Sequence, residues 1–354
     1  MTRSGVVSIA GRPNVGKSTL LNRLIGQKLS ITAHKPQTTR HTLIGVHTVG
    51  EVQVAFVDTP GIHVGARQKL NQVLNRTASS ALHGVDLVLL MVHAPVWNDD
   101  DQRAWETVIA AEVPFLLVVN KIDTIPRKAE LLPYLKTLPE HERCLEVRMI
   151  SARKGDGVEE LERTILSRMP ERDWQYGADD LTDRSARFLA AEAVREQLTR
   201  QLSAELPYAL TVEIETFEDT MAKGGTPLYR IGAVIWVDKA SQKGIVIGKG
   251  GERLKDVGRR ARESMQTLFD RKIFLELWVR VKEGWADDER ALASLGYDLA
   301  SKGARVARRG AGMPEDSPSS DIEGDIEGGS DGDTITGTDG DAPHGVDGRS
   351  DPTR

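Results

Sequence analysis

The sequence contains little cysteine, few aromatic residues and no long apolar run. Cys144 is the only cysteine among 354 residues, which excludes an internal disulfide and a zinc cluster built from cysteines. The longest apolar stretches, residues 85–92 and 113–119, are far shorter than the roughly 20 residues that span a bilayer. They predict buried parallel strands instead. Residues 1–5 do not resemble a signal peptide, because an apolar strand follows at once. These features fit a protein of the reducing cytoplasm.

Negative charge is distributed unevenly along the chain. Residues 315–354 hold twelve acidic and two basic side chains, a local charge of −10, whereas the whole chain carries −5. The remainder is therefore mildly basic, at +5. Residues 303–354 also have too few aromatic and branched apolar side chains to bury the surface that folding requires. We expect a disordered acidic tail, which either keeps the protein soluble or competes with nucleic acid for a basic surface.

A glycine-rich motif near the start of the chain predicts a phosphate-binding loop. Residues 11–18 read Gly-Arg-Pro-Asn-Val-Gly-Lys-Ser, between an apolar stretch at 6–10 and leucines at helical spacing in 19–25. This is the G-x-x-x-x-G-K-[ST] pattern in the strand–loop–helix context that it requires. Backbone N–H groups and the helix N-terminus attract phosphate there. Lys17 is expected to reach the outer phosphates, and the Ser18 hydroxyl to bind Mg²⁺.

A second motif, at residues 58–61, follows a predicted strand and reads Asp-Thr-Pro-Gly. Asp58 can organise Mg²⁺ through water, and the Gly61 N–H can contact a γ-phosphate. The next residue is Ile62, where Ras-type enzymes have a glutamine that orients the attacking water. Since an isoleucine cannot hydrogen-bond water, hydrolysis would depend on other groups.

Two later motifs point to guanine as the base. Residues 120–123 read Asn-Lys-Ile-Asp after a predicted strand. The Asp123 carboxylate can accept from N1–H and from the 2-amino group of guanine, a donor pair that adenine lacks. Residues 151–153 read Ser-Ala-Arg, and the Ala152 N–H can reach guanine O6. Because ligands bind beyond the carboxyl ends of parallel strands, we expect all these motifs to form one site. The predicted nucleotide-binding residues are Gly11, Arg12, Pro13, Asn14, Val15, Gly16, Lys17, Ser18, Asp58, Thr59, Pro60, Gly61, Ile62, Asn120, Lys121, Ile122, Asp123, Ser151 and Ala152.

The second half of the chain carries a glycine loop before a basic helix. A helix is predicted from residue 185, strands at 210–215, 229–237 and 273–281, and a final helix at 287–300. The loop reads Gly-Lys-Gly-Gly, and a bare backbone there lets nucleic acid approach closely. This order of elements is that of a type II KH domain, which binds single-stranded RNA beside its G-x-x-G loop. The predicted RNA-binding residues are Gly248, Lys249, Gly250, Gly251, Arg253 and Lys255.

Four segments carry a resemblance to one family. They are residues 36–41 (Pro-Gln-Thr-Thr-Arg-His), 180–185 (Asp-Leu-Thr-Asp-Arg-Ser), 246–251 (Val-Ile-Gly-Lys-Gly-Gly) and 284–290 (Gly-Trp-Ala-Asp-Asp-Glu-Arg). With the nucleotide motifs, they resemble the Era family of bacterial GTPases, in the TrmE-Era-EngA group of the translation-factor class. The resemblance covers about residues 4–302 and implies an α/β P-loop GTPase domain, with a mainly parallel six-stranded sheet covered by helices, followed by a smaller α+β type II KH domain.

The resemblance also implies roles for individual residues. Thr39 would join Ser18 and Asp58 in the magnesium site in the GTP state, with Thr38 as the competing assignment. Asn14 would help to hold a potassium ion, although a loop asparagine is also an ordinary turn former. The catalytic residues implied are therefore Lys17, Thr39, Gly61 and Asn14.

We expect four regions: a G domain at 1–168, a linker at 169–184, a KH domain at 185–302 and the tail at 303–354. The resemblance implies binding of GTP and GDP, hydrolysis of GTP, binding of the 3′ region of 16S ribosomal RNA, and action on the 30S ribosomal subunit as a monomer. It also implies peripheral association with the inner face of the cell membrane. The alternative is a nucleotide-dependent RNA chaperone in which hydrolysis is incidental. A GTP-binding signalling module without RNA is contradicted by the glycine loop.

Overall fold

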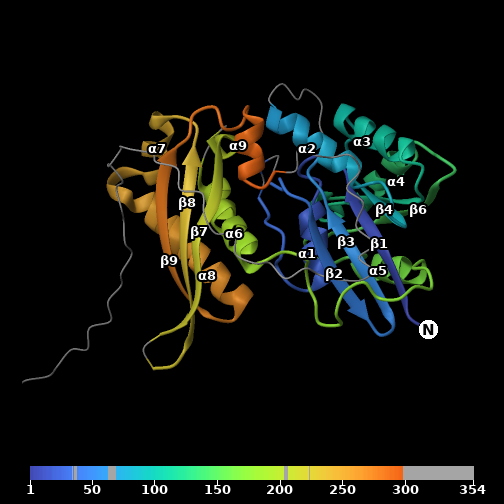
Figure 1. Ribbon diagram of the computed structural model, residues 1–354. Helices are drawn as coiled ribbons and strands as arrows, with labels where there is room; N and C mark the ends of the chain where they lie inside the picture. Colours follow the sequence, from blue (N-terminus) through green and yellow to red (C-terminus); the bar gives the residue numbers. More distant parts are fainter. Residues whose placement is uncertain (34, 36–37, 63–68, 203–205, 223, 298–354) are drawn as a thin grey trace, which may run out of the picture.

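The computed structural model describes residues 1–297, apart from 34, 36–37, 63–68, 203–205 and 223. The predicted tail lies outside the described residues. Figure 1 shows two bodies side by side, each with its own sheet. Among the described residues, no helix has both the length and the apolar character needed to cross a membrane.

The first body is a six-stranded sheet with helices on both faces. Its strand order is β2-β3-β1-β4-β5-β6, and only β2 runs antiparallel to its neighbour. Strands β4 and β5 are the two apolar runs of the sequence, and both are buried almost throughout because helices cover each face. The elements are β1 (Arg3–Ala10), α1 (Lys17–Ile25), β2 (Leu43–Val49), β3 (Val52–Asp58), α2 (Lys69–Ser80), β4 (Leu87–His93), α3 (Asp99–Ala110), β5 (Phe115–Asn120), α4 (Leu131–Leu135), β6 (Cys144–Met149) and α5 (Val158–Ser167).

The second body packs three helices on a three-stranded sheet, in the order β7-β8-β9. Strand β8 pairs antiparallel with β7 and parallel with β9. The helix–strand–strand–helix–helix–strand order confirms the predicted α+β fold class. The elements are α6 (Ala186–Gln201), β7 (Leu210–Met221), β8 (Pro227–Val237), α7 (Ala240–Ile247), α8 (Glu252–Phe269), β9 (Lys272–Val281) and α9 (Glu289–Ser294).

Two predicted elements have other bounds in the structure, and one helix was missed. Strand β7 continues to Met221 instead of ending near 215, because its polar second half pairs along β8. Helix α7 was not predicted. The final helix, predicted to reach residue 300, ends at Ser294, because Gly296 adopts a left-handed conformation with φ +79°.

The segment predicted as a linker follows the first sheet closely. Pro170 accepts a hydrogen bond from the Ser4 N–H at 3.1 Å, and Leu181 accepts one from the Val46 N–H at 2.9 Å. The first contact joins the segment to β1, and the second satisfies a backbone group that would otherwise be unpaired at the edge strand β2. The segment is therefore held against the first body between β1 and α6.

Candidate functional site

The glycine-rich loop lies at the carboxyl end of β1 and leads directly into α1. Gly16 has φ +107°, and a Cβ atom on it would lie 2.3 Å from the Asn120 side-chain nitrogen. Any other residue would therefore be strained and would displace Asn120. Helix α1 begins at Lys17 with no side-chain cap, so its first N–H groups face the loop.

Lys17 lies inside the loop and is almost fully buried. Its ammonium group donates to the carbonyl oxygens of Gly11 and Arg12, each at 3.0 Å. Burial lowers the pKa of Lys17 to about 8, although the nearby Asp58 carboxylate opposes this shift. The loop thus holds a partly desolvated cation that a phosphate group would stabilise.

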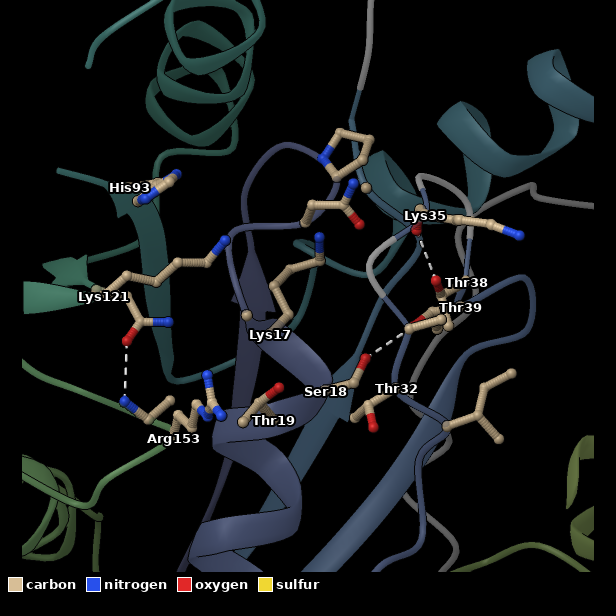
Figure 2. A pocket seen from close by; sticks show the side chains of 18 of the residues that line it. Lys17, Ser18, Thr19, Thr32, Lys35, Thr38, Thr39, His93, Lys121 and Arg153 are labelled. Atoms are coloured by element: carbon tan, nitrogen blue, oxygen red, sulfur yellow. Dashed lines mark hydrogen bonds between the residues drawn. The ribbon is translucent and has the colours of Figure 1, made fainter. Parts of the chain in front are cut away.

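Three oxygen-bearing side chains meet beside Lys17, as Figure 2 shows for Ser18 and Thr39. The Ser18 hydroxyl lies 2.8 Å from the Thr39 hydroxyl and 2.7 Å from Asp58 Oδ2. The other carboxylate oxygen, Asp58 Oδ1, is buried and has no hydrogen-bond partner among the described residues. Hydroxyl and carboxylate oxygens are ligands that Mg²⁺ prefers, so these residues fit such an ion. Thr38 instead donates to the Lys35 carbonyl at 2.6 Å.

The residues predicted to recognise the base also converge. Asn120 is buried at the end of β5, donates to the Val15 carbonyl at 2.7 Å and accepts from the Ala152 N–H at 2.9 Å. The Ala152 N–H, which we expected to be available for guanine O6, is thus engaged by Asn120 in this structure. The Asp123 carboxylate accepts from the buried Ser151 hydroxyl at 2.8 Å, which fixes its orientation.

A cavity of about 1120 Å³ joins the loop to this base-recognition end. Of the predicted nucleotide-binding residues, it is lined by Pro13, Asn14, Gly16, Lys17, Ser18, Gly61, Asn120, Lys121, Asp123 and Ala152. Gly11, Val15, Asp58, Thr59 and Ser151 lie buried behind that lining. Thr59, for example, donates to the Ile9 carbonyl at 2.9 Å.

Ile62 and Asn14, two further predicted residues, have contrasting surroundings. Ile62 is 3 % exposed and packs in the apolar core beneath the sheet, among Val6, Val57 and Val88. It has no group that can orient a water molecule. Asn14 is exposed on the rim of the cavity with φ +63°, a left-handed conformation that asparagine tolerates better than most residues.

Several residues that line the cavity were not predicted from the sequence, and two of them belong to the second body. Thr199 and Arg200 of α6 line it together with Thr32, His93 and Arg153. Because α6 lies about 180 residues after the phosphate-binding loop in the chain, no local sequence pattern indicates that its residues line the nucleotide cavity.

Arg12 also has a role that the motif did not reveal. Its guanidinium donates to both carboxylate oxygens of Asp101, at 2.8 and 2.9 Å, and Asp101 is fully buried at the start of α3. The Asn98 side chain and Asp101 form a reciprocal cap there. The ion pair therefore ties the glycine-rich loop to α3, and the Arg12 carbonyl in turn positions Lys17.

Replacing Arg12 by glutamine is expected to lower the free energy of unfolding by about 3 to 5 kcal/mol, because the buried Asp101 carboxylate loses its charged partner. Urea denaturation measures this change. The Arg12→Gln, Asp101→Asn double variant removes both charges and should recover at least half of the loss. Equal stability of the single and double variants would contradict the assigned pairing.

The glycine loop of the second body lies between α7 and α8. Gly248 has φ +77° and ψ 174°, and a Cβ on it would lie 2.7 Å from the Cβ of Arg253. Lys249 and Gly250 are exposed, and a Cβ on Gly250 would meet nothing within 4 Å. The loop therefore offers open backbone beside a lysine, next to the half-exposed side chain of Ile245.

The basic helix α8 is less uniformly basic than its sequence indicates. Arg259 pairs with Asp256 and Glu263, and Arg260 pairs with Asp256, at 2.7 Å in each case. Arg253 is turned back to the Ile245 carbonyl. Lys249 and Lys255 have no ion-pair partner among the described residues, so they are the cations most available at this surface.

Both segments of the chain match known families. Residues 6–121 match the family model described as 50S ribosome-binding GTPase, and residues 205–286 match that of the KH domain. GTPase Era of Xanthomonas campestris pv. campestris is 52 % identical over 296 residues, which cover 84 % of this chain and 98 % of that protein. The chain belongs to the Era family of GTPases.

Other relatives and solved structures agree with that assignment. GTPase Era of Pseudomonas aeruginosa is 51 % identical, over 84 % of this chain and 95 % of that protein. A crystal structure of Era in complex with MgGDPNP and nucleotides 1506–1542 of 16S ribosomal RNA matches 84 % of this chain and all of that chain, with a TM-score of 0.80 and 36 % identity. A variant of Aquifex aeolicus Era bound to GDP·AlF4⁻ matches equally well. As a member of the Era family, the protein is a hydrolase that acts on GTP.

The Era-family segment at residues 284–290 lies at the contact between the two bodies. Trp285 is fully buried and packs with Leu70 and Leu74 of α2, in one apolar cluster with Leu292 of α9. The Leu70 N–H donates to the Ala286 carbonyl at 3.2 Å. Helix α2, which follows the Asp58–Gly61 motif in the chain, is therefore in direct contact with the second body (Figure 1).

Proposed function

We propose that this Era-family GTPase is a GTP-controlled switch that binds the 3′ region of 16S ribosomal RNA through its KH domain, in 16S rRNA processing and assembly of the 30S ribosomal subunit. The observation that carries the proposal is the shared cavity. Thr199 and Arg200 of the KH helix α6 line the same cavity as the phosphate-binding loop, so a bound nucleotide has direct access to the RNA-binding domain. The related Era structure with RNA supports the choice of target.

The site residues have the following proposed roles. Lys17 binds the outer phosphates, the Gly61 N–H contacts the γ-phosphate, and Asp123 accepts from the guanine edge. Ser18, Thr39 and Asp58 would hold Mg²⁺, for which Asp58 Oδ1 has a lone pair to spare. When bound, the ion supplies positive charge near the β- and γ-phosphate oxygens. The hydroxyl of Thr39, not that of Thr38, lies beside Ser18, which supports Thr39 as the magnesium threonine.

The RNA site is proposed at the glycine loop and the start of α8. The exposed backbone at Gly250 and the Lys249 ammonium suit a phosphodiester backbone. Lys255 adds positive charge along the same face, and Arg253 can add more once its hydrogen bond to the Ile245 carbonyl is broken. Gly248 and Gly251, which both have positive φ, shape the turn. The domain limits proposed are 1–168, 169–184, 185–302 and 303–354.

Further parts of the proposal rest on the family resemblance. They are a potassium ion held with the help of Asn14, a monomeric state, a cytoplasmic location, and peripheral association with the inner face of the cell membrane. For potassium, the supporting observation is that Asn14 lies on the cavity rim next to the phosphate-binding loop.

Single-turnover hydrolysis of GTP, with and without an oligonucleotide of the 16S rRNA 3′ region, tests the switch in potassium and in sodium buffers. Because Ile62 cannot orient water, the rate without RNA should be slow, and RNA should accelerate it at least about tenfold. Potassium should give the faster rate, and Asn14→Ala should remove the difference between the two salts. RNA that binds without acceleration would favour the chaperone alternative, and equal rates in both salts would remove the potassium site.

A further inference from the structure

Helix α6 of the KH domain carries charged residues on the side that faces the G domain. Glu192, Arg195 and Glu196 are all buried, although such residues are seldom fully buried without a partner. Glu196 accepts from the Thr32 N–H at 3.0 Å, and the Thr38 carbonyl accepts from the Arg195 guanidinium. The loop between α1 and β2 is thus held at two points by one helix of the other domain.

The Arg195 contact lies next to the proposed magnesium threonine. The Thr38 carbonyl and the Thr39 nitrogen belong to the same peptide group, which is planar. A donor that fixes the Thr38 oxygen therefore fixes the plane from which Thr39 projects toward Ser18, whose hydroxyl lies 2.8 Å away. On the other side, Arg40 donates to the Leu210 carbonyl at 2.7 Å, so the backbone is anchored to the KH domain before and after Thr39.

Arg195 is itself held in place by Glu192. Two guanidinium nitrogens donate to the two carboxylate oxygens, at 2.7 and 2.6 Å. Such a planar bidentate pair leaves little rotational freedom. The opposite side of α6 packs in the KH core, where Val194 and Leu198 share a cluster with Leu254 and Val257 of α8. The guanidinium is thus a rigid extension of the KH domain into the G domain.

We propose that Arg195 is a positioning residue for GTP hydrolysis, supplied by the KH domain, which holds the Thr38 carbonyl so that Thr39 faces Ser18. The inference rests on the proposed role of Thr39. It implies that a movement of α6, whatever its origin, changes hydrolysis without any KH side chain touching the reacting atoms. If the ion pair were merely structural, it would instead stabilise the GDP-bound and the GTP-bound protein equally.

The test uses the full-length protein without RNA, so that a failure of the RNA-binding proposal does not affect it. Glu192→Gln, Arg195→Gln removes both charges of the pair together. We expect single-turnover hydrolysis about tenfold slower or more and a higher Mg²⁺ concentration for half-maximal rate, with GDP affinity within about twofold. Arg187→Gln is the control, because Arg187 lies on the same helix but, within the described part of the chain, donates only to the Ile214 and Glu215 carbonyls of its own domain. It should change neither rate nor Mg²⁺ dependence.

Combination with Thr39→Ala decides the mechanism. If Arg195 acts through Thr39, adding the pair variant to Thr39→Ala slows hydrolysis no further. Multiplying effects, or an unchanged rate and Mg²⁺ dependence in the pair variant, would overturn the inference.

If the pair variant does not fold, Arg195→Lys carries the same test, because it keeps the charge beside Glu192 but has one nitrogen for two partners. The same slower rate and higher Mg²⁺ requirement are then expected, and wild-type values would overturn the inference.

Discussion

Replacing Asp123 by asparagine is expected to weaken GTP binding by about 10²- to 10⁴-fold, because two hydrogen bonds to a charged acceptor are lost. The same change should create affinity for xanthosine triphosphate. Xanthine has a carbonyl where guanine has its 2-amino group, so the asparagine amide can donate to that oxygen while its own oxygen accepts from N1–H. The Ser151 hydroxyl, 2.8 Å from the present carboxylate, can orient the new side chain in the same way.

Equilibrium binding of fluorescent GDP and competition by the two triphosphates measure this exchange of specificity. Asp156→Asn is the matched control, because Asp156 is an exposed acid of the neighbouring loop and does not line the cavity. It should leave both affinities within about twofold. Retained GTP affinity in Asp123→Asn would show that the base is recognised elsewhere.

The second large effect is expected at the glycine loop of the KH domain. Gly248→Asp, Gly250→Asp should weaken RNA binding by about 100-fold or more, because two carboxylates would face the phosphodiester backbone at close range. GTP hydrolysis without RNA should stay within about twofold, because the loop lies between α7 and the start of α8, at the end of the KH domain away from the G domain (Figure 1), and does not line the nucleotide cavity. Filter binding of labelled RNA and phosphate release measure the two activities.

A matched control separates charge at the loop from charge and backbone strain in general. Gly224 and Gly225 also have positive φ values, +94° and +76°, and a Cβ on either meets nothing within 4 Å. They lie in the turn between β7 and β8, away from the G-x-x-G loop. Gly224→Asp, Gly225→Asp should therefore bind RNA nearly as the wild type does. RNA affinity that survives in the loop variant, or falls equally in the control, would contradict the proposed RNA site.

Local sequence determined the elements that carry the nucleotide motifs. The two apolar strands β4 and β5 and the helix that begins at Lys17 were predicted within a residue or two. This succeeded because each depends on short-range signals: an apolar run buried on both faces, and a helix start after Gly16. The fold class, a P-loop GTPase domain followed by a KH domain, is confirmed.

Local sequence patterns did not predict the structure of segments whose stabilising contacts come from distant parts of the chain. The polar second half of β7 has no apolar alternation, and it forms a strand only because β8 supplies partners for its backbone. On α6, the sequence indicates one apolar face, but the structure buries ten of its sixteen residues. The G domain covers the side that an isolated KH domain would leave in water.

The sequence by itself determined which ligand groups the protein is equipped to meet. Lys17 and Ser18 predict phosphate, Asp123 predicts guanine, and the loop at Gly250 predicts nucleic acid, because each follows from the chemistry of a short motif. Only the tertiary structure decided how these sites are joined. The α6 helix reaches the nucleotide cavity through Arg200 and holds the Thr38 carbonyl through Arg195. Those contacts depend on the packing of one domain on the other, which no local pattern encodes.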